Sequence, residues 1–335
     1  MSDRWERLTD LYHAAVALPA DERTALLTEE CGDDPVLQAD VARMIAAHDR
    51  ASAGRLAEPP ASDTIDRFGP YRILKEIGHG PTSTVYRAHD AVRDVPVVVK
   101  ALDASLASAL DFPRFRKQML HAATVQHPGI VQPIAIEEAA GRIFLVTPFL
   151  QGESLRTRLN RDRTLPLAEA IGITRQVAES LGAAHAADIL HKDVKPTNIF
   201  VDGPRALLLD LGVARAISRS MEMTMTGTGL TLGKPGYMSP EHASGGVEMS
   251  SRADLYSLGA VLYEMLGGEP PFTGPQPQVL MRTLTETPVS ITKKRDGLPP
   301  EVGVVLDRLL AKDPAARYAS AAEVVEALSG IGNRE

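Results

Sequence analysis

Cysteine is almost absent from this sequence, since Cys31 is the only one in 335 residues. An intrachain disulfide and a metal site built from several cysteines are therefore excluded, and a reducing compartment is favoured. Basic residues are not in excess either: 36 lysines and arginines stand against 43 aspartates and glutamates, a net charge of −7. A nucleic-acid-binding protein, which concentrates basic side chains on one surface, is not expected.

Long apolar segments are missing as well. No run approaches the roughly 18 residues that are needed to cross a membrane. The N-terminal stretch MSDRWERLTDLY carries charges throughout and lacks the apolar core of a signal peptide. We therefore expect a cytoplasmic protein without a membrane segment. Hydrophobic residues make up 44% of the chain and charged residues 24%, which is ordinary globular usage and argues against a disordered chain.

Residues 1–50 are predicted to form a small helical module. Apolar residues such as Leu8, Tyr12 and Ala15 recur at helical spacing. Asp34, which precedes a proline, suits the start of another helix. Two interpretations stay open. The helices pack on one another or on the neighbouring domain, or they bind a partner or a second copy of the chain.

The composition changes along the chain in a way that suggests domain boundaries. Residues 1–60 hold 6 basic and 12 acidic residues, whereas the other 275 residues hold 30 and 31. Residues 51–67 are rich in alanine, serine, proline and glycine, without periodicity, and are predicted to be a linker. Residues 68–150 and 151–330 then differ from each other in the pattern of their apolar residues.

Short β-branched runs fill the first of these two regions. YRILKEIG, STVYRAHD, VPVVVKAL and GRIFLVTPFL predict strands, and FPRFRKQMLHAATVQHP predicts one helix that ends before Pro128. Beyond about residue 153, patterns such as LAEAIGITRQVAESLGAAHAADI and ADLYSLGAVLYEMLGG are helical. The sequence therefore predicts a small β-rich lobe followed by a larger α-rich lobe.

A glycine-rich turn and a lysine mark the β-rich lobe. In IGHGPTSTVYRA, Gly78 and Gly80 lie between two strands, and Ser83 stands where a third glycine is often found. Glycines let backbone N–H groups approach phosphate closely, although a plain hairpin turn explains the same residues. Lys100 ends the apolar strand VVVK and could reach phosphates beneath that turn.

The stretch LHKDVKPTNIF carries the strongest chemical signal. Asp193 could orient or deprotonate an attacking hydroxyl, Lys195 could neutralise a phosphate, and Asn198 offers a neutral oxygen to Mg²⁺. Twelve residues later, Asp210 ends the apolar strand of LLLDLG and could be a second Mg²⁺ ligand. The glycine turn, the strand lysine, D-x-K-x-x-N and D-x-G in this order form a specific joint pattern.

Residues 68–330 resemble a eukaryotic-like serine/threonine protein kinase of the bacterial type. HKDVKPTN is similar to the catalytic loop H-R-D-L-K-P-x-N, and the DLG of Asp210, Leu211 and Gly212 is similar to D-F-G. The resemblance implies an α+β, bilobal protein-kinase-like fold. Its small antiparallel β-rich lobe contains one helix, its larger lobe is α-helical, and here a small helical module precedes both.

Motifs in the helical lobe extend the resemblance. YMSPE resembles A-P-E and ends at Glu241. ADLYSLG resembles the helix whose aspartate, here Asp254, braces the catalytic loop. KDPAARY resembles the segment whose arginine, here Arg317, pairs with that glutamate. Lys195, two residues after the catalytic aspartate, is similar to serine/threonine kinases rather than tyrosine kinases.

The resemblance also implies ligands and roles. ATP and Mg²⁺ are the expected cofactors, with Mn²⁺ as a possible substitute, and the partner is a protein substrate. Catalysis is assigned to Asp193, Lys195 and Lys100, and metal binding to Asn198 and Asp210. The residues expected around ATP are Ile77, Gly78, Gly80, Ser83, Val85, Val98, Lys100, Pro148, Leu150 and Phe200, with Thr147 as gatekeeper.

Four supporting positions depart from the family pattern. Gln118 stands where a glutamate usually pairs with the strand lysine, so it can hydrogen-bond Lys100 only without charge. A charge-assisted bond contributes roughly 1.5–3 kcal/mol against roughly 0.5–1.5 for a neutral one. Val98 narrows the adenine slot, Lys192 replaces an arginine that clamps phosphate, and Lys234 replaces a threonine that faces the catalytic aspartate.

Two functions follow from this balance of intact and altered positions. The first is an ATP-dependent serine/threonine protein kinase in signalling, with reduced or conditional activity. The alternative is a pseudokinase that binds nucleotide or acts as a scaffold. Thr226 and Thr228 fall where related kinases autophosphorylate, although they are equally explained as loop threonines.

Overall fold

The computed structural model describes residues 66–80, 82–139, 141–221, 235–244 and 249–331. Near the N-terminus it also describes residues 11, 14–15, 18–19, 22–31, 34, 37–38, 41–42 and 45. The chain divides into two compact units, Met1–Ile65 and Asp66–Glu335. Within these described ranges, no helix combines the length and the apolar character that crossing a membrane requires.

The N-terminal unit has its own small apolar core. Helix α2 spans Arg23–Cys31. The side chain of Asp34 accepts a hydrogen bond from the Leu37 backbone N–H at 2.9 Å. A bond of this kind satisfies a backbone donor at the start of a helix. The buried apolar side chains of this unit are Leu11, Ala15, Leu27, Cys31, Leu37, Val41 and Ile45.

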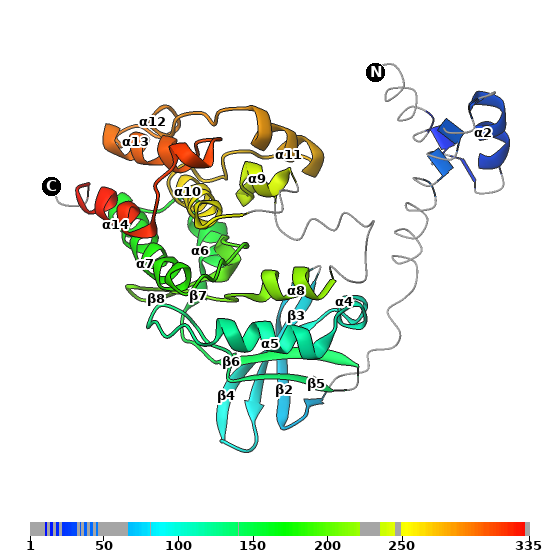
Figure 1. Ribbon diagram of the computed structural model, residues 1–335, viewed down its shortest axis with the longest axis horizontal. Helices are drawn as coiled ribbons and strands as arrows, with labels where there is room; N and C mark the ends of the chain where they lie inside the picture. Colours follow the sequence, from blue (N-terminus) through cyan, green and yellow to red (C-terminus); the bar gives the residue numbers. More distant parts are fainter. Residues whose placement is uncertain are drawn as a thin grey trace. The chain divides into compact units, whose positions relative to one another are not determined.

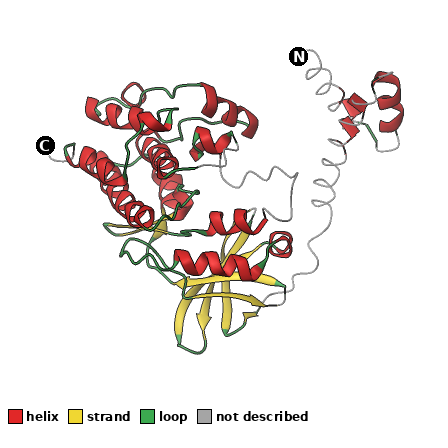
Figure 2. Cartoon of the chain, viewed as in Figure 1, coloured by secondary structure: helices red, strands yellow, loops and turns green. Residues whose placement is uncertain are grey.

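A six-stranded antiparallel sheet, with strand order β1-β2-β3-β4-β6-β5, opens the larger unit (Figures 1 and 2). Its strands are β1 Arg67–Phe68, β2 Tyr71–Gly80, β3 Ser83–Asp90, β4 Val95–Leu102, β5 Ala135–Ala139 and β6 Arg142–Pro148. Val97 and Val99 of β4 are fully buried on one face. Side chains alternate between faces along a strand, so Val98 and Lys100 lie together on the other face.

Helices α4 (Ala104–Ala109) and α5 (Phe112–Ala122) follow β4. Asp111 caps α5 by accepting a hydrogen bond from the Arg114 N–H, and Pro113 occupies a first-turn position where no donor is needed. Phe115 and Met119 are one turn apart and buried, and they join a cluster with sheet residues such as Leu145. Helix α5 therefore covers the sheet face that also carries Lys100 (Figure 1).

A second, three-stranded sheet lies where the chain enters the helical lobe. Its order is β7-β8-β9, and its strands are β7 Glu153–Ser154, β8 Ile199–Asp202 and β9 Arg205–Leu208. The short helix η1, Pro196–Asn198, leads directly into β8. Helix α8, Val213–Met221, begins five residues after β9 ends. The segment that carries Asp193, Lys195 and Asn198 thus leads into β8, and the segment that carries Asp210 follows β9.

Helices make up the rest of the larger unit. Helix α10 is buried almost along its whole length and packs against α7, α13 and α12, so it forms the centre of this lobe. The helices are α6 Leu155–Asp162, α7 Leu167–Ala186, η2 Pro235–Tyr237, α9 Pro240–Ala243, α10 Ser251–Gly267, α11 Gln276–Thr285, α12 Ile291–Lys294, α13 Pro300–Leu309, η3 Pro314–Ala316 and α14 Ala321–Ser329. The predicted α+β class, with a β-rich lobe before an α-helical lobe, is confirmed.

Candidate active site

Three residues of the predicted catalytic loop meet at one carboxylate. The Lys195 Nζ lies 2.6 Å from Asp193 Oδ2. The Asn198 amide Nδ2 donates to the backbone oxygen of Asp193 at 2.9 Å and to its Oδ2 at 3.0 Å. All three side chains are at least half-buried. The loop therefore presents Asp193 in a defined orientation, with a cation and an amide against the same oxygen.

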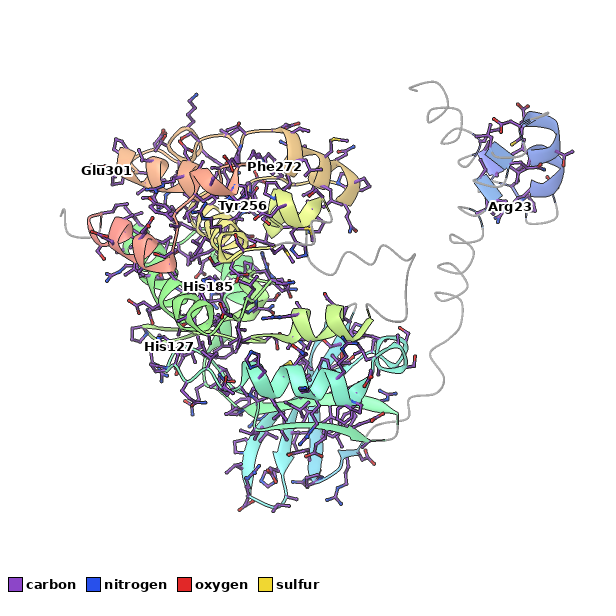
Figure 3. The ribbon with its side chains drawn as sticks, in the orientation of Figure 1. Arg23, His127, His185, Tyr256, Phe272 and Glu301 are labelled. Carbon is purple, nitrogen blue, oxygen red and sulfur yellow. The ribbon has the colours of Figure 1, made fainter. Side chains whose placement is uncertain are left out.

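Asp254, on α10, binds the backbone of this loop through its carboxylate. Its carboxylate accepts hydrogen bonds from the His191 N–H at 2.9 Å and the Lys192 N–H at 2.8 Å, and it lies 2.8 Å from the Nε2 of His185, which Figure 3 labels. Burial alone raises the pKa of Asp254, but the bond to His185 and the neighbouring donors outweigh burial and lower it. Lys192 adopts φ +64°, a strained conformation that these bonds stabilise.

Lys100 and Asp210 form an ion pair across 110 residues of sequence. Lys100 Nζ lies 2.5 Å from Asp210 Oδ2. Burial raises the pKa of Asp210, yet the charge and hydrogen bond of Lys100 outweigh it, so the pKa is lowered and the carboxylate is ionised. His191 Nε2 lies 2.8 Å from the Leu209 carbonyl and so ties the Asp210 segment to the catalytic loop.

Gln118 does not bond to Lys100, although its amide could form such a bond without charge. The residue lies half-buried on α5. Its side chain has no hydrogen-bond partner among the residues that the structure describes. Lys100 is instead held by Asp210, whose full charge makes it a stronger partner than a neutral amide.

Helix α8 follows Gly212 and packs against α5. Val213, Ala216 and Ile217 are buried in the same cluster as residues of α5. Gly212 has φ +81°, and a Cβ there would lie 2.5 Å from the Ala122 Cβ, so only glycine fits. A helical segment therefore begins directly after the DLG motif and lies beside the helix that carries Gln118.

Several of the residues expected around ATP share one face of the six-stranded sheet. Val85 is opposite Lys100 across β3 and β4, and Val98 is opposite Thr147 across β4 and β6. Directly opposed residues share a face of the sheet. Because Lys100 on this face reaches Asp210, the face is turned toward the segment that carries Asp210.

The glycine turn is the tip of the β2–β3 hairpin. Gly80 pairs with Ser83 and Gly78 with Val85, with a register shift just before Gly78. Ile77, on the same strand, is half-exposed. Pro148 and Leu150 lie at and after the end of β6, and Phe200 on β8 pairs with Ser154. The hairpin and the strand end therefore border the face that carries Lys100.

The late-motif residues form a second buried ion pair. Arg317 donates from Nη1 and Nη2 to the two oxygens of Glu241, at 2.7 and 2.8 Å. Its guanidinium also lies 4.9 Å from the ring centre of Tyr256. Lys234, Thr226 and Thr228 fall outside the residues that the structure describes.

Sequence reasoning missed two sets of residues that support this site. His185 was missed although it lies in the sequence only six residues before His191. Arg156, Tyr237 and Glu264 were missed because they come from three distant segments and meet only in the fold. A charged residue inside the otherwise apolar α10, such as Glu264, was the available signal.

The arrangement of an ionised Asp210 beside a strand lysine, with Asp193 and Asn198 on the adjoining loop, is that of a phosphotransferase of the protein kinase class. The protein kinase domain family matches residues 71–328, well over half of the chain. The chain belongs to this family.

Its relatives are bacterial serine/threonine protein kinases. The chain is 37% identical over 261 residues to the serine/threonine-protein kinase PknB of Mycobacterium leprae, covering 76% of this chain and 42% of that protein. It is 34% identical over 277 residues to pkn2 of Myxococcus xanthus, covering 80% and 33%, and 35% identical over 260 residues to PknE of Mycobacterium bovis, covering 77% and 45%. The chain thus matches less than half the length of these relatives.

Proposed function

We propose that this chain is an ATP-dependent serine/threonine protein kinase that transfers the γ-phosphate of ATP to a hydroxyl of a protein substrate. The observation that carries the proposal is the convergence of Lys100 and Asp210, at 2.5 Å, with the loop that holds Asp193, Lys195 and Asn198. Phosphoryl transfer needs little covalent help from a protein, so positioned charges of this kind are the catalytic equipment.

The residues present fit a Mg²⁺ ion shared with ATP. Asp210 uses Oδ2 for Lys100, which leaves Oδ1 for a metal. The amide nitrogen of Asn198 donates two hydrogen bonds to Asp193, so the amide oxygen of Asn198 points away from Asp193. Among the described residues, no three His, Cys, Asp or Glu side chains gather to hold a metal. One carboxylate, one amide oxygen and phosphate oxygens are what Mg²⁺ takes in such sites, and the bound ion neutralises phosphate charge.

Asp193 is the group that would face the substrate hydroxyl. Its Oδ2 is engaged by Lys195 and Asn198, which fixes the carboxylate plane and leaves Oδ1 for the hydroxyl proton. Lys195 carries its positive charge to the position where the transferring phosphate gains negative charge. Lys100, once released by Asp210, would hold the α- and β-phosphates.

The activity of this arrangement is reduced or conditional in our proposal. Lys100 forms its ion pair with Asp210 and not with a residue of α5. Helix α8 packs its apolar face against α5. Kinases of this class need the strand lysine paired to that helix for full activity, and Gln118 offers no charge for the pairing. A shift of α5 and α8 would therefore accompany activation.

A phosphotransfer assay tests the proposal. The full chain is incubated with Mg²⁺, γ-labelled ATP and a generic basic protein, beside an Asp193→Asn control. We expect label in serine or threonine of the acceptor, with the control reduced by at least a hundredfold, as general acid–base groups contribute roughly 10²–10⁴ in rate. A wild-type phosphotransfer rate no higher than that of Asp193→Asn would contradict the proposal that the protein is an enzyme. Thermal stabilisation by Mg²⁺-ATP in that case would identify a nucleotide-binding pseudokinase.

The proposal also covers the role of residues 1–50 and the cellular compartment of the protein. Residues 1–50 would bind a partner or a second copy of the chain, which sedimentation of the full chain with and without them would reveal. A reducing compartment such as the cytoplasm remains the prediction from the single cysteine, Cys31.

A further inference from the structure

Lys312, between α13 and η3, is a half-buried lysine far from the residues assigned so far. Its Nζ donates to the Thr283 carbonyl oxygen of α11 at 2.6 Å. The same Nζ lies 4.7 Å from the ring centre of Phe272, which is buried and which Figure 3 labels. Within the part of the chain that the structure describes, no carboxylate forms an ion pair with this lysine. An uncompensated cation in a half-buried place needs an explanation.

A small hollow adjoins Lys312. Its volume is about 80 Å³, and Lys312 is one of the residues that line it. Apolar side chains from α10, α12 and the end of α13 form much of the remaining wall, among them Tyr263, Ile291, Leu306 and Leu310. About 10–15 Å³ is enough for one water-sized group, so the hollow has room for a small group carried by the lysine.

The surroundings of Lys312 favour its neutral amine. Burial lowers the pKa of the amine most, the positive charge of Arg317 lowers it further, and Glu286 offsets part of this, so that the pKa is about 8. Two more charged groups lie nearby. Asp307 lines the same hollow, and the Arg282 guanidinium packs on the aromatic ring that Lys312 also contacts.

Lys294 provides the contrast within the same lobe. Its Nζ also lies near an aromatic ring, 5.4 Å from the centre of Tyr263, but it forms an ion pair with Glu269 at 2.5 Å. A nearby carboxylate favours the charged ammonium, whose nitrogen has no free lone pair. The acceptor of Lys312 is the uncharged carbonyl of Thr283. A neutral amine can keep that bond through one of its hydrogens and still present its lone pair to a reagent.

We propose that Lys312 is a modification site, at which the side-chain amine is acylated by a small activated acyl donor of the acyl phosphate class. The amine nitrogen attacks the acyl carbon, so that a C–N bond forms and the C–O bond to phosphate breaks. Phosphate leaves with the bonding electron pair, and one amine proton passes to water. The hollow beside the lysine receives the acyl group. This inference does not depend on the proposed kinase function.

Acylation would remove the contacts that Lys312 makes as a cation. Thr283, whose carbonyl the lysine binds, lies in the last turn of α11. A positive charge near the last carbonyls of a helix stabilises that end of the helix. The nitrogen of an acylated lysine can still donate a hydrogen bond, but the charge and the cation–π contact with Phe272 are lost. We therefore expect acylation to loosen the end of α11.

Acetyl phosphate tests the site on the intact, full-length protein. Brief reactions at pH 7, 8 and 9 are analysed by peptide mass spectrometry, which gives the acetylation rate at each lysine. At pH 7 an amine with a pKa of about 8 is about one-tenth neutral, against roughly one part in 2,500 for an ordinary lysine of pKa about 10.4. We expect Lys312 to react at least tenfold faster at pH 7 than the exposed Lys293 and the paired Lys294.

The pH profile and an unfolded control decide whether the fold causes this preference. Between pH 8 and pH 9 the rate at Lys312 should about double, whereas an ordinary lysine gains about tenfold. In urea-unfolded protein the preference for Lys312 should disappear. The inference is overturned if Lys312 and Lys293 react equally in the folded protein, if the rate at Lys312 rises tenfold between pH 8 and pH 9, or if the preference persists in urea.

Hydrogen exchange tests the consequence for α11. Lys312→Gln resembles the acylated side chain, and Lys312→Arg keeps the positive charge. Amides of residues 282–286 should exchange several-fold faster in Lys312→Gln and in the acetylated wild type, and at close to the wild-type rate in Lys312→Arg. Lys293→Gln, at an exposed position, is the matched control and should leave them unchanged. Unchanged exchange in both Lys312→Gln and the acetylated protein would contradict the link to α11. Neither experiment requires phosphate transfer by the protein.

Discussion

At the scale of single residues, the charge opposite Lys100 decides which partner the lysine takes. Within the described structure, Lys100 bonds to Asp210 at 2.5 Å, and Gln118 is left without a partner. A neutral amide competes poorly with a carboxylate for an ammonium group, because the bond to a charged acceptor is about twice as strong. The partner that Lys100 takes therefore depends on whether position 118 of α5 offers a charged or a neutral group.

Replacing Gln118 by glutamate should raise the phosphotransfer rate. A charged partner gains about 1 kcal/mol over a neutral one, and about 1.4 kcal/mol is a factor of ten in rate, so we expect an increase of roughly fivefold. Initial rates with Mg²⁺-ATP measure it. Gln126→Glu, at an exposed position beyond α5, is the control and should leave the rate unchanged. An equal or lower rate for Gln118→Glu would show that the glutamine is not the limiting feature.

The Glu241–Arg317 pair should make stability depend on pH. Burial raises the pKa of Glu241, but the hydrogen bonds of Arg317 outweigh it and lower the pKa. A carboxyl with a lowered folded-state pKa stabilises the fold at pH values above its unfolded pKa, about 4.3, and this contribution is lost as pH falls through the folded value. Glu241→Gln should cost about 3–5 kcal/mol at pH 7, because it leaves a fully buried guanidinium unpaired.

Urea unfolding between pH 7 and pH 3 measures this effect. The gap between wild type and Glu241→Gln should narrow below pH 4, as the wild-type carboxylate takes up its proton. Glu286→Gln, which removes an exposed partner of Arg282, should change stability by about 0.5 kcal/mol or less at any pH. A gap for Glu241→Gln that stays constant with pH would contradict the assignment.

At the scale of elements, α5 and α8 act as one packed layer on the sheet (Figure 1). Helix α8 buries Val213, Ala216 and Ile217 in the cluster that includes Phe115 and Met119 of α5. The spacing of these three residues, at i, i+3 and i+4, is that of one helical face. Any movement of α5 toward Lys100 must therefore carry α8 with it or unpack this face.

Truncating Ile217 should loosen this layer. Ile217 is 3% exposed, and Ile→Ala at a buried site costs roughly 2–5 kcal/mol through lost transfer energy and the cavity left behind. Differential scanning calorimetry should show the loss in the transition of the larger unit. The control is Val304→Ala, at a residue that is 67% exposed, for which about 0.5 kcal/mol or less is expected. Equal transitions for the two variants would mean that α8 is not packed on α5 in solution.

At the scale of the whole molecule, the two units keep separate apolar cores. Among the residues that the structure describes, the N-terminal cluster contains residues between Leu11 and Ile45, and three clusters of the larger unit contain residues from Leu102 onward. The division between the units falls at Ile65 and Asp66. A unit that buries its own apolar side chains can fold without the other.

Residues 66–335 should therefore fold on their own. We expect the shortened chain to unfold cooperatively with a midpoint close to that of the larger unit in the full chain, and to keep the thermal stabilisation by Mg²⁺-ATP. Calorimetry with and without the nucleotide measures both. Loss of the cooperative transition on removing residues 1–65 would show that the units depend on each other.

The sequence by itself determined the class of this protein and its local chemistry. Asp193, Lys195 and Asn198 lie within six positions, so the loop and its short helix bring them together with little help from the rest of the chain. The alternation of Val98 and Lys100 with buried valines likewise follows from strand geometry. Patterns of this kind are visible in sequence because neighbours in the chain are neighbours in space.

Only the tertiary structure decided the partners of these residues. The pairing of Lys100 with Asp210 rather than Gln118, the packing of α8 on α5, and the ring of Arg156, Tyr237 and Glu264 all join segments far apart in the chain. Contacts over such separations depend on how the sheet and α10 place their neighbours, and on competition between charged and neutral acceptors for one cation. Neither is encoded in any single window of the sequence, which is why the state of the site emerged only from the folded chain.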